Sequence, residues 1–174
     1  MTKKIFGTSG EKIIIEEFLE GEEISFFSLV DVNGFILPLT TAQDHKKIGE
    51  GDLGLNTGGM GAYSPVPFIK QNQINEFVIA FVKPIIDDLK NNGIFFSGIF
   101  YAGLIMSKNG PKLLEINVRF GDPEAQAILP RLKTDLLDLL LATSQGKLDK
   151  YKLLQWDSNY CMNVVLASKG YPES

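Results

Sequence analysis

Lys112-Leu-Leu-Glu-Ile-Asn-Val-Arg-Phe-Gly-Asp-Pro-Glu124 combines potential metal ligands, a cation and a tight turn in one short run. If the first half of this run is a strand, its side chains alternate between the two faces of a sheet. Leu114 and Ile116 then point into a core, whereas Glu115 and Asn117 point together to the other side. The stretch therefore predicts an amphipathic strand with a polar face at its end.

That polar face has a specific chemistry. A carboxylate and an amide oxygen, as in Glu115 and Asn117, suit a hard cation such as Mg²⁺. Arg119 follows on the same face if the chain stays extended, and an arginine beside a cation suits a phosphoryl group or an oxyanion. The alternative is a strand end whose polar residues only cap a turn. Asp122 precedes Pro123 and so is held extended, which either presents its carboxylate to a ligand or simply forms the turn.

Composition narrows the class of protein. The chain has 174 residues and a net charge of −4, enough for one domain with a sizeable core and unfavourable for bulk attraction to nucleic acid or anionic membrane. Cys161 stands alone, so no internal disulfide is possible. No run reaches transmembrane length and no signal peptide is recognisable, which predicts a cytoplasmic protein.

The first third of the chain reads as strands. Ile13 to Leu19 predicts a buried strand, and Glu23 to Val32 a second one rich in β-branched and aromatic residues. Asn33-Gly34 predicts a hairpin leading into a third strand, Phe35 to Leu39. Pro38 indicates that this third strand is at a sheet edge or ends there.

The remainder alternates between helices and strands. Thr40 to Pro67 has no apolar period and predicts a long loop, either functional or disordered. Gln73 to Asn91 has helical spacing, with a kink or break expected near Pro84. Further elements are expected as strands at 98–106, 112–117 and 161–166, a turn at 108–110, and a helix at 134–144 that begins at Thr134 or Asp135 and ends before Gly146. The pattern indicates a mixed α+β fold with antiparallel hairpins.

Two more clusters could carry chemistry. Ile15 to Glu23 offers strand backbone to a planar base and carboxylates to hydroxyl groups, or else is a solvated acidic turn. Thr41 to Lys47 and Asn56 to Pro65 combine lysines with glycines that let backbone N–H groups approach an anion; a flexible surface loop is the alternative. His45 is either a base or ligand, or a structural hydrogen-bonding residue.

Taken together, these residues resemble the ATP-grasp ligases, and among them the phosphoribosylamine–glycine ligases. The resemblance covers nearly the whole chain, in the order of the family. It rests on Glu16-Glu-Phe-Leu-Glu-Gly-Glu-Glu23, Gln43-Asp-His-Lys46, Asn56-Thr-Gly-Gly-Met-Gly-Ala-Tyr-Ser-Pro65, Gly98-Ile-Phe-Tyr-Ala-Gly103 and Glu115-Ile-Asn-Val-Arg-Phe-Gly-Asp-Pro-Glu124.

The resemblance implies a fold and a reaction. The expected fold is an incomplete ATP-grasp domain of the α+β class, a mostly antiparallel sheet flanked by helices, over residues 1–167, with 168–174 starting a linker. The expected reaction phosphorylates glycine with ATP, and the amine of 5-phosphoribosylamine attacks the glycyl phosphate, in the second step of purine synthesis. The implied cofactors are ATP and Mg²⁺ or Mn²⁺; the implied partners are these small molecules and further domains of the same polypeptide, with no nucleic acid and no membrane.

The resemblance also assigns roles to residues. Glu115 and Asn117 correspond to the metal ligands, and Arg119 to the catalytic cation. The adenine and ribose contacts correspond to Glu16, Phe18, Leu19 and Glu23. The positions expected to hold glycine and the phosphoribosyl amine are Asp44, His45, Lys46, Asn56, Thr57, Gly58, Gly59, Met60, Gly61, Asp122, Pro123 and Glu124.

Two departures from the family pattern shape these expectations. The family enzymes are more than twice as long, and the upstream half of the nucleotide clamp has no counterpart here, so little or no turnover is expected from this chain alone. The strand before Glu115 carries Tyr101-Ala-Gly103 where many ATP-grasp enzymes have an acidic ligand, which leaves two protein ligands for the metal. The alternatives are another ATP-grasp carboxylate–amine ligase and a non-catalytic binding domain derived from the same fold.

Overall fold

The computed structural model describes residue 7 and residues 11–173. Its strands are β1 (Glu22–Val30), β2 (Ile36–Asp44), β3 (Lys47–Gly49), β4 (Leu53–Asn56), β5 (Gly61–Ser64), β6 (Gly98–Ser107), β7 (Gly110–Asn117) and β8 (Cys161–Val164). Its α-helices are α1 (Gln71–Phe77), α2 (Lys83–Asn91), α3 (Glu124–Ile128) and α4 (Leu136–Gln145). A π-helical turn at Val78–Val82 and short 3₁₀ turns at Leu129–Arg131 and Leu148–Lys150 complete the described structure.

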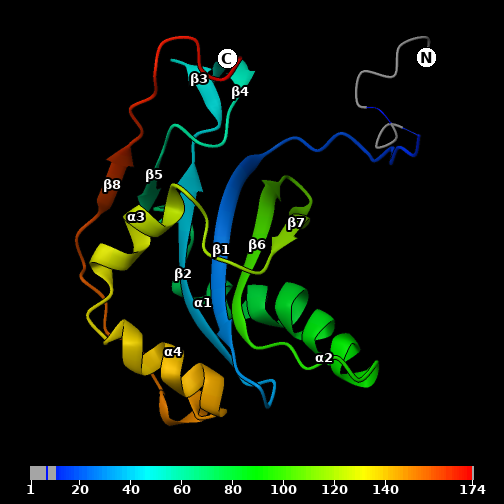
Figure 1. Cartoon of the computed structure of the whole chain (residues 1–174), viewed down its shortest axis with the longest axis vertical. Helices are drawn as coiled ribbons and strands as arrows, with labels where there is room; N and C mark the ends of the chain where they lie inside the picture. The colour runs from blue at the N-terminus through cyan, green and yellow to red at the C-terminus, as the bar shows by residue number, and fades with distance from the viewer. Residues whose placement is uncertain (1–6, 8–10, 174) are drawn as a thin grey trace.

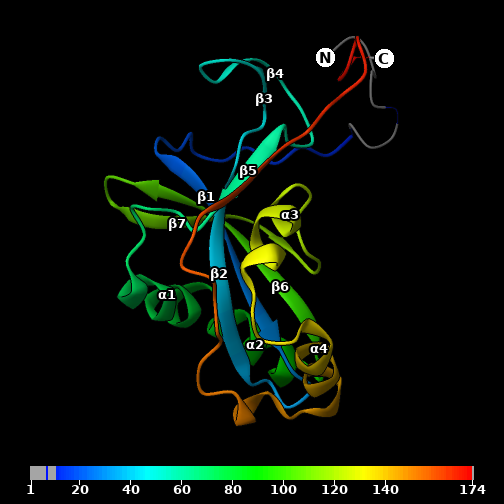
Figure 2. The ribbon, with the colours of Figure 1, turned by 90° about the vertical axis from the view of Figure 1, so that its left-hand side faces the viewer.

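The strands form one large antiparallel sheet and one small ribbon. The large sheet has the order β7-β6-β1-β2-β5-β8, and β3 pairs with β4 beside it. Helices α1 and α2 lie on one side of the sheet, and α3 and α4 lie on the other (Figures 1 and 2). This arrangement confirms the expected α+β fold with a mostly antiparallel sheet flanked by helices.

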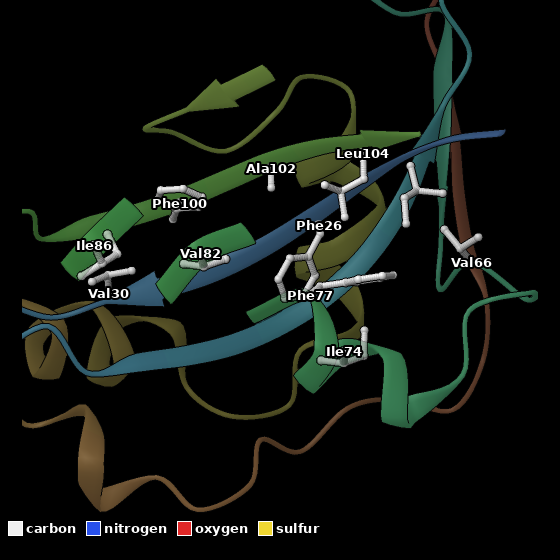
Figure 3. Packing of buried hydrophobic residues seen from close by; sticks show 11 residues of the cluster. Phe26, Val30, Val66, Ile74, Phe77, Val82, Ile86, Phe100, Ala102 and Leu104 are labelled. Atoms are coloured by element: carbon white, nitrogen blue, oxygen red, sulfur yellow. The ribbon is translucent and has the colours of Figure 1, made fainter. Parts of the chain in front are cut away.

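Each face of the sheet has its own hydrophobic core, because neighbouring side chains of β1 point in opposite directions. Phe26 packs under α1, its ring centroid 5.5 Å from that of Phe77 (Figure 3). Phe27 faces the other way and stacks on Tyr101 at 4.9 Å, within the cluster that includes Leu139 of α4. The sheet is therefore buried on both faces over most of its length.

The long helical segment is interrupted where proline predicts it. Gln71 to Asn91 winds continuously, but Val78–Val82 is π-helical and α2 begins at Lys83 with Pro84 in its first turn. A proline lacks the N–H needed inside a helix and is tolerated at the start of one. The expected break near Pro84 is therefore confirmed.

The expected ends of α4 are also confirmed. Asp135 is its N-terminal cap, and Gly146, at φ +67°, follows its last residue.

The β1–β2 hairpin is organised by a buried carboxylate. Asp31 is 1% exposed. Its Oδ1 accepts hydrogen bonds from the backbone N–H groups of Asn33 and Phe35, and its Oδ2 accepts one from Leu148. Asp31 thereby joins the turn predicted from Asn33-Gly34 to the chain that follows α4.

Replacing Asp31 with alanine is expected to lower the free energy of unfolding by about 3 kcal/mol, because three backbone donors lose their acceptor. Urea unfolding measures this. Asp149→Ala, which removes an exposed carboxylate from the neighbouring 3₁₀ turn, is the matched control and should change stability by less than about 0.5 kcal/mol. Similar losses of unfolding free energy in the two variants would show that the hydrogen bonds accepted by Asp31 do not stabilise the fold.

Two strand predictions near the N-terminus need correction. Residues 13–19 are not a buried strand: they are extended without strand pairing, and Ile14, Ile15 and Phe18 are 87%, 87% and 89% exposed. Their composition favours a strand, but a strand requires a partner, and none of the described strands pairs with them. The third strand does not end at residue 39, since β2 continues to Asp44.

Pro38 sits where a proline is tolerated. It pairs with Ser28 on one side, and β2 pairs with β5 only at Gln43 and Asp44. The other side of β2 is therefore open at Pro38, so its missing N–H leaves no ladder bond unmade. The expectation that the strand is at a sheet edge or ends at Pro38 is therefore wrong for the strand as a whole, since β2 lies between β1 and β5 and continues to Asp44; only its first part is open on one side.

The segment expected to be a long loop contains β3, β4 and β5. The β3–β4 ribbon projects from one end of the large sheet (Figure 2). Its strands are only three and four residues long, and their apolar residues, Ile48, Leu53 and Leu55, are exposed, so no apolar period extended far enough to predict it. β5 lies inside the sheet between β2 and β8.

The expectation that Leu114 and Ile116 point into a core is wrong, since each is 40% exposed. β7 is an edge strand, and its register with β6 shifts so that Leu113 faces Leu104. Leu113 packs against the core in their place. Across residues 7 and 11–173, no helix has the length and apolar character needed to cross a membrane.

Candidate functional site

Strand register gathers polar residues on one sheet face. Gly103 of β6 lies between Ser25 of β1 and Glu115 of β7, and Asn117 is paired with Tyr101. Residues directly opposite one another in an antiparallel pair share a face. Residues far apart in sequence are thus brought together at the end of the sheet.

A pocket of about 180 Å³ opens on this face. Its lining is mainly polar and comes from four strands and the residues that follow them: Glu23, Ile24, Ser25, Asp44, Lys46, Tyr101, Gly103, Leu104, Leu114 and Glu115. Gly103 makes room for a neighbour, because a Cβ there would lie 2.9 Å from Cγ of Glu115. The absence of a side chain at Gly103 leaves space over β6 for the Glu115 carboxylate.

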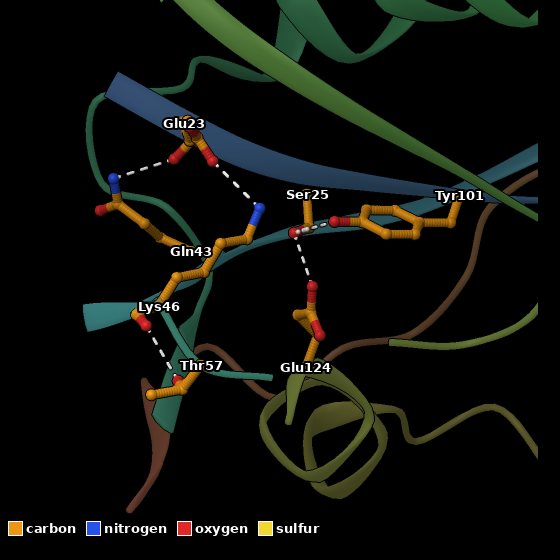
Figure 4. A network of polar contacts seen from close by, with 7 residues as sticks. All are labelled: Glu23, Ser25, Gln43, Lys46, Thr57, Tyr101 and Glu124. Carbon is orange, nitrogen blue, oxygen red and sulfur yellow. Dashed lines mark hydrogen bonds and ion pairs between the residues drawn. The ribbon is translucent and has the colours of Figure 1, made fainter. Parts of the chain in front are cut away.

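An ion pair crosses the mouth of the pocket. Lys46 Nζ donates to Oε2 of Glu23 at 3.1 Å, and both side chains are partly exposed (Figure 4). Burial lowers the pKa of the Lys46 ammonium, but the hydrogen bond to Glu23 and the charges of Glu23, Glu115 and Asp44 outweigh it and leave the pKa raised. Lys46 is therefore a fixed cation among carboxylates.

Ser25 connects the pocket to the turn after β7. Its hydroxyl donates to Oε1 of Glu124 at 2.8 Å and shares a 3.1 Å hydrogen bond with the Tyr101 hydroxyl (Figure 4). Glu124 is 3% exposed, and burial raises the pKa of Tyr101. Our sequence reasoning missed Ser25 and Tyr101. The signal that could have found Ser25 is its place two residues after Glu23, on the same face of β1.

Asp44 lines the pocket and lies close to Gly59. Its Oδ1 is buried and accepts no hydrogen bond within the described structure. Burial raises the pKa of Asp44 to about 7, with the charge of Glu124 adding to the rise. A buried acceptor without a donor points to a position that a ligand donor could fill.

The raised pKa of Asp44 predicts a pH dependence of stability. The folded chain holds a proton that the unfolded chain releases near pH 3.8, so this contribution is complete below about pH 4 and is lost as pH rises through about 7. We expect the Tm of the wild type to fall relative to that of Asp44→Asn across this interval. Thermal unfolding of both proteins at several pH values measures the difference, and a gap that does not change with pH would contradict the raised pKa.

The glycine-rich loop lies against the same site and is held in place. The Thr57 hydroxyl and N–H both donate to the carbonyl of Lys46, at 2.9 and 2.7 Å. Gly58 N–H donates to the Tyr171 hydroxyl at 2.9 Å, and Met60 accepts from the N–H of residue 165. Asn56 ends β4, and Gly61 begins β5. The loop is therefore an ordered wall of the site.

His45 points away from the pocket. It follows Asp44 in an extended segment and so lies on the opposite face, where its ring stacks on Tyr63 at 5.9 Å. The Tyr63 hydroxyl donates to Gln43, whose amide donates to Glu22 at 3.0 Å. The motif Gln43-Asp-His-Lys46 therefore has residues on both faces: Asp44 and Lys46 line the pocket, whereas Gln43 and His45 contact Tyr63.

Several expected site residues do not line the pocket. Glu16 and Phe18 are exposed and Leu19 is half-buried, in the extended segment before β1. Arg119 is exposed and donates to the carbonyl of the next residue at 2.9 Å. Asp122 is exposed and accepts from Gln126 at 2.6 Å. Pro123 and Glu124 do not line the pocket either, but Pro123 is buried against Gly59, and Glu124 accepts a hydrogen bond from Ser25, which lines it.

The donor set limits how a metal could be held. Among residues 7 and 11–173, no group of three or more histidine, cysteine or acidic side chains is placed to bind one ion. Glu115 is exposed at the pocket and Asn117 is half-buried on the same face of β7. Two oxygen ligands fit a hard cation that shares the rest of its coordination with water and phosphate.

Comparison with known proteins defines the family. Residues 1–125 match the family described as "Phosphoribosylglycinamide synthetase, ATP-grasp (A) domain". The chain belongs to this family. It is 50% identical over 167 residues to the phosphoribosylamine–glycine ligase of Agrobacterium fabrum, and 48% identical over 170 residues to that of Salmonella typhimurium. These matches cover 96% and 97% of the chain and 39% of each relative, so the chain spans about two fifths of their length.

Solved structures confirm the ATP-grasp fold. The phosphoribosylamine–glycine ligase of Thermotoga maritima is 32% identical and superposes with a TM-score of 0.80, over 91% of this chain and 39% of that one. The phosphoribosylaminoimidazole carboxylase ATPase subunit of Aquifex aeolicus, 20% identical, superposes at 0.57 over 91% of this chain. This second likeness shows a shared fold alone. Enzymes of the ATP-grasp fold use ATP and divalent metals.

Proposed function

We propose that this chain serves the ATP-dependent joining of glycine to 5-phosphoribosylamine, as part of a phosphoribosylamine–glycine ligase. The observation that carries the proposal is the pocket in which Glu23, Lys46 and Glu115 meet, in a chain about half identical to ligases of that name. Fixed charges on a rigid sheet are what phosphoryl transfer requires, because that chemistry depends on positioning and electrostatic stabilisation.

Glu115 and Asn117 are the proposed ligands of a Mg²⁺ or Mn²⁺ ion. When bound, such an ion neutralises phosphate charge. Lys46 places a further cation beside Glu115, and its charge is strengthened by that neighbourhood. Arg119 is near in sequence, exposed and in no ion pair of the described structure, so it is free to turn toward a transferred phosphate.

The segment before β1 is the proposed adenine contact. Its backbone is unpaired, and Phe18 is 89% exposed, so both can meet a planar base. Glu16 and the backbone of Leu19 lie in the same segment. Glu23, at the end of the segment and on the pocket, is the proposed acceptor for ribose hydroxyls.

The acceptor end of the site is proposed at Asp44 and the loop that packs on it. Residues 56–61 form that loop, Pro123 packs against its Gly59, and the charge of Glu124 acts on Asp44. An ammonium or amine donor suits the unpaired Oδ1 of Asp44. His45 and Asp122 face elsewhere and are proposed only to hold the backbone of their turns.

The test is phosphate release from ATP with glycine and 5-phosphoribosylamine, omitting each in turn. It is run on the chain and on a chimaera in which the chain replaces its counterpart in the Salmonella typhimurium relative. Release that needs both substrates supports the proposal. A folded chimaera that releases phosphate only with a different amine would indicate another carboxylate–amine ligase. A folded chimaera inactive with every amine, beside an active parent, would contradict the proposal.

A further inference from the structure

A second and larger hollow lies on the open edge of β2. It has a volume of about 910 Å³ and shares no lining residue with the pocket at Glu115. Residues 36–41 of β2 form one wall, because this part of the strand pairs only with β1. Phe35, the segment 65–69, helix α1, Arg131 and the chain from Asp149 to Tyr160 contribute further lining residues. Its size is that of a small-molecule site.

The hollow contains a buried cation. Arg131 is 6% exposed and lines it. Its Nε donates to the carbonyl of Asn159 at 2.9 Å, and its two terminal nitrogens donate to the Asp157 carbonyl and the Ser64 hydroxyl, each at 3.0 Å. The guanidinium also lies 5.7 Å from the centre of the Trp156 ring. Every one of these partners is neutral.

No carboxylate within the described residues forms an ion pair with Arg131. The carboxylate of Asp157 is nearby but pairs with Lys133 at 3.1 Å. Burial lowers the pKa of Arg131, and the charge of nearby Asp157 offsets this only in part. Removing a cation from water is unfavourable unless an anion compensates it. A guanidinium has five N–H groups, and three are used, so two remain to bind an anion.

We propose that this hollow binds a small organic anion with an apolar or aromatic body. The anionic group pairs with Arg131, for which carboxylate and phosphate oxygens have the matching geometry. The body packs on Trp156, Tyr151 and Leu154. The exposed rim charges, Asp149 and Lys152, have opposite signs and give no net preference of their own.

Trp156 is the single tryptophan of the chain, so its fluorescence reports directly on the hollow. Phenylacetate and phenylacetamide have the same shape and differ in charge, and both are titrated against the whole chain. We expect a saturable change in emission with phenylacetate, and binding about tenfold weaker with phenylacetamide. Equal responses to the two compounds, or no response to either, would overturn the proposal.

Variants locate the anion. Arg131→Gln is expected to remove the preference for phenylacetate, whereas Lys152→Gln, which removes a rim charge, is expected to keep it. Asn75→Phe places a ring in the hollow from the exposed side of α1 and should weaken both compounds without touching Arg131. Preference lost in Lys152→Gln and kept in Arg131→Gln would place the anion at the rim and refute the assignment.

Arg131 is buried, so its replacement could unfold the chain, and the wild type supplies an independent measurement. In ¹⁵N-resolved NMR spectra, phenylacetate should shift the Nε–H of Arg131 and the indole N–H of Trp156 together. Shifts confined to residues outside the hollow, such as Lys108 and Lys112, would refute the site regardless of how the variant behaves.

Discussion

Replacing Glu115 with glutamine will reduce substrate-dependent phosphate release about 100-fold or more, with little change in stability. The substitution is assayed in whichever of the two proteins, the chain or the chimaera, releases phosphate with both substrates. The substitution keeps the size of the side chain and removes its negative charge. Glu115 is the exposed carboxylate of the pocket on β7, and a neutral amide is a much weaker ligand for a hard cation. Because Glu115 lies on the surface of an edge strand, its core contacts are few and the fold should tolerate the change.

The matched control is Glu76→Gln, an exposed glutamate on α1, far from the pocket in the fold. It makes the same chemical change and should leave phosphate release unaltered. A separate readout is Mn²⁺ binding in the presence of ADP, followed by electron paramagnetic resonance. Unchanged Mn²⁺ affinity in Glu115→Gln would remove Glu115 from the metal site, even if activity were lost.

Gly59→Ala is expected to lower the free energy of unfolding by about 3 kcal/mol, the largest stability effect we anticipate for a single methyl group. Gly59 has φ +120°, a conformation that side chains disfavour. A Cβ there would lie 2.4 Å from Cδ of Pro123 and 2.8 Å from Oδ1 of Asp44. Backbone strain and overpacking add, because the proline ring is itself buried. Urea unfolding measures the loss.

Gly58→Ala is the control from the same loop. Its φ is not in the positive region, and the nearest atom to its Cβ is the Tyr171 hydroxyl, at 3.3 Å. We expect a change within about 1 kcal/mol. If both variants lost stability equally, the loop would be sensitive to any added side chain. The loss in Gly59→Ala could then not be attributed to the close contact between residues 59 and 123.

Local sequence signals predicted the elements whose structure depends on neighbouring residues. The Asn33-Gly34 hairpin, the interruption at Pro84 and the cap of α4 at Asp135 are all confirmed, because turn, proline and capping chemistry act within a few residues. The same signals failed for residues 13–19. Their composition favours a strand, yet a strand exists only when a partner supplies its hydrogen bonds.

The candidate site was predicted in part. Alternation correctly placed Glu115 and Asn117 on one face of β7, but the strand is at the sheet edge, so its apolar face is half-exposed. The motif Gln43-Asp-His-Lys46 reads as one unit in sequence, whereas an extended backbone sends Asp44 and His45 to opposite faces. Ser25 and Glu124 form a hydrogen bond although they are 99 residues apart in the sequence, and no local sequence pattern predicts such a contact.

By itself, the sequence determined the α+β class, the hairpins at Asn33-Gly34 and at 108–110, and the residue types available for chemistry, because these follow from propensity, periodicity and turn geometry over short distances. The tertiary structure decided which of those residues meet. Register between β1, β6 and β7 set Ser25, Gly103 and Glu115 side by side, and the close approach of Gly59 to Pro123 closed the site around Asp44. Such contacts depend on strand pairing and packing between distant segments, and only the folded chain specifies them.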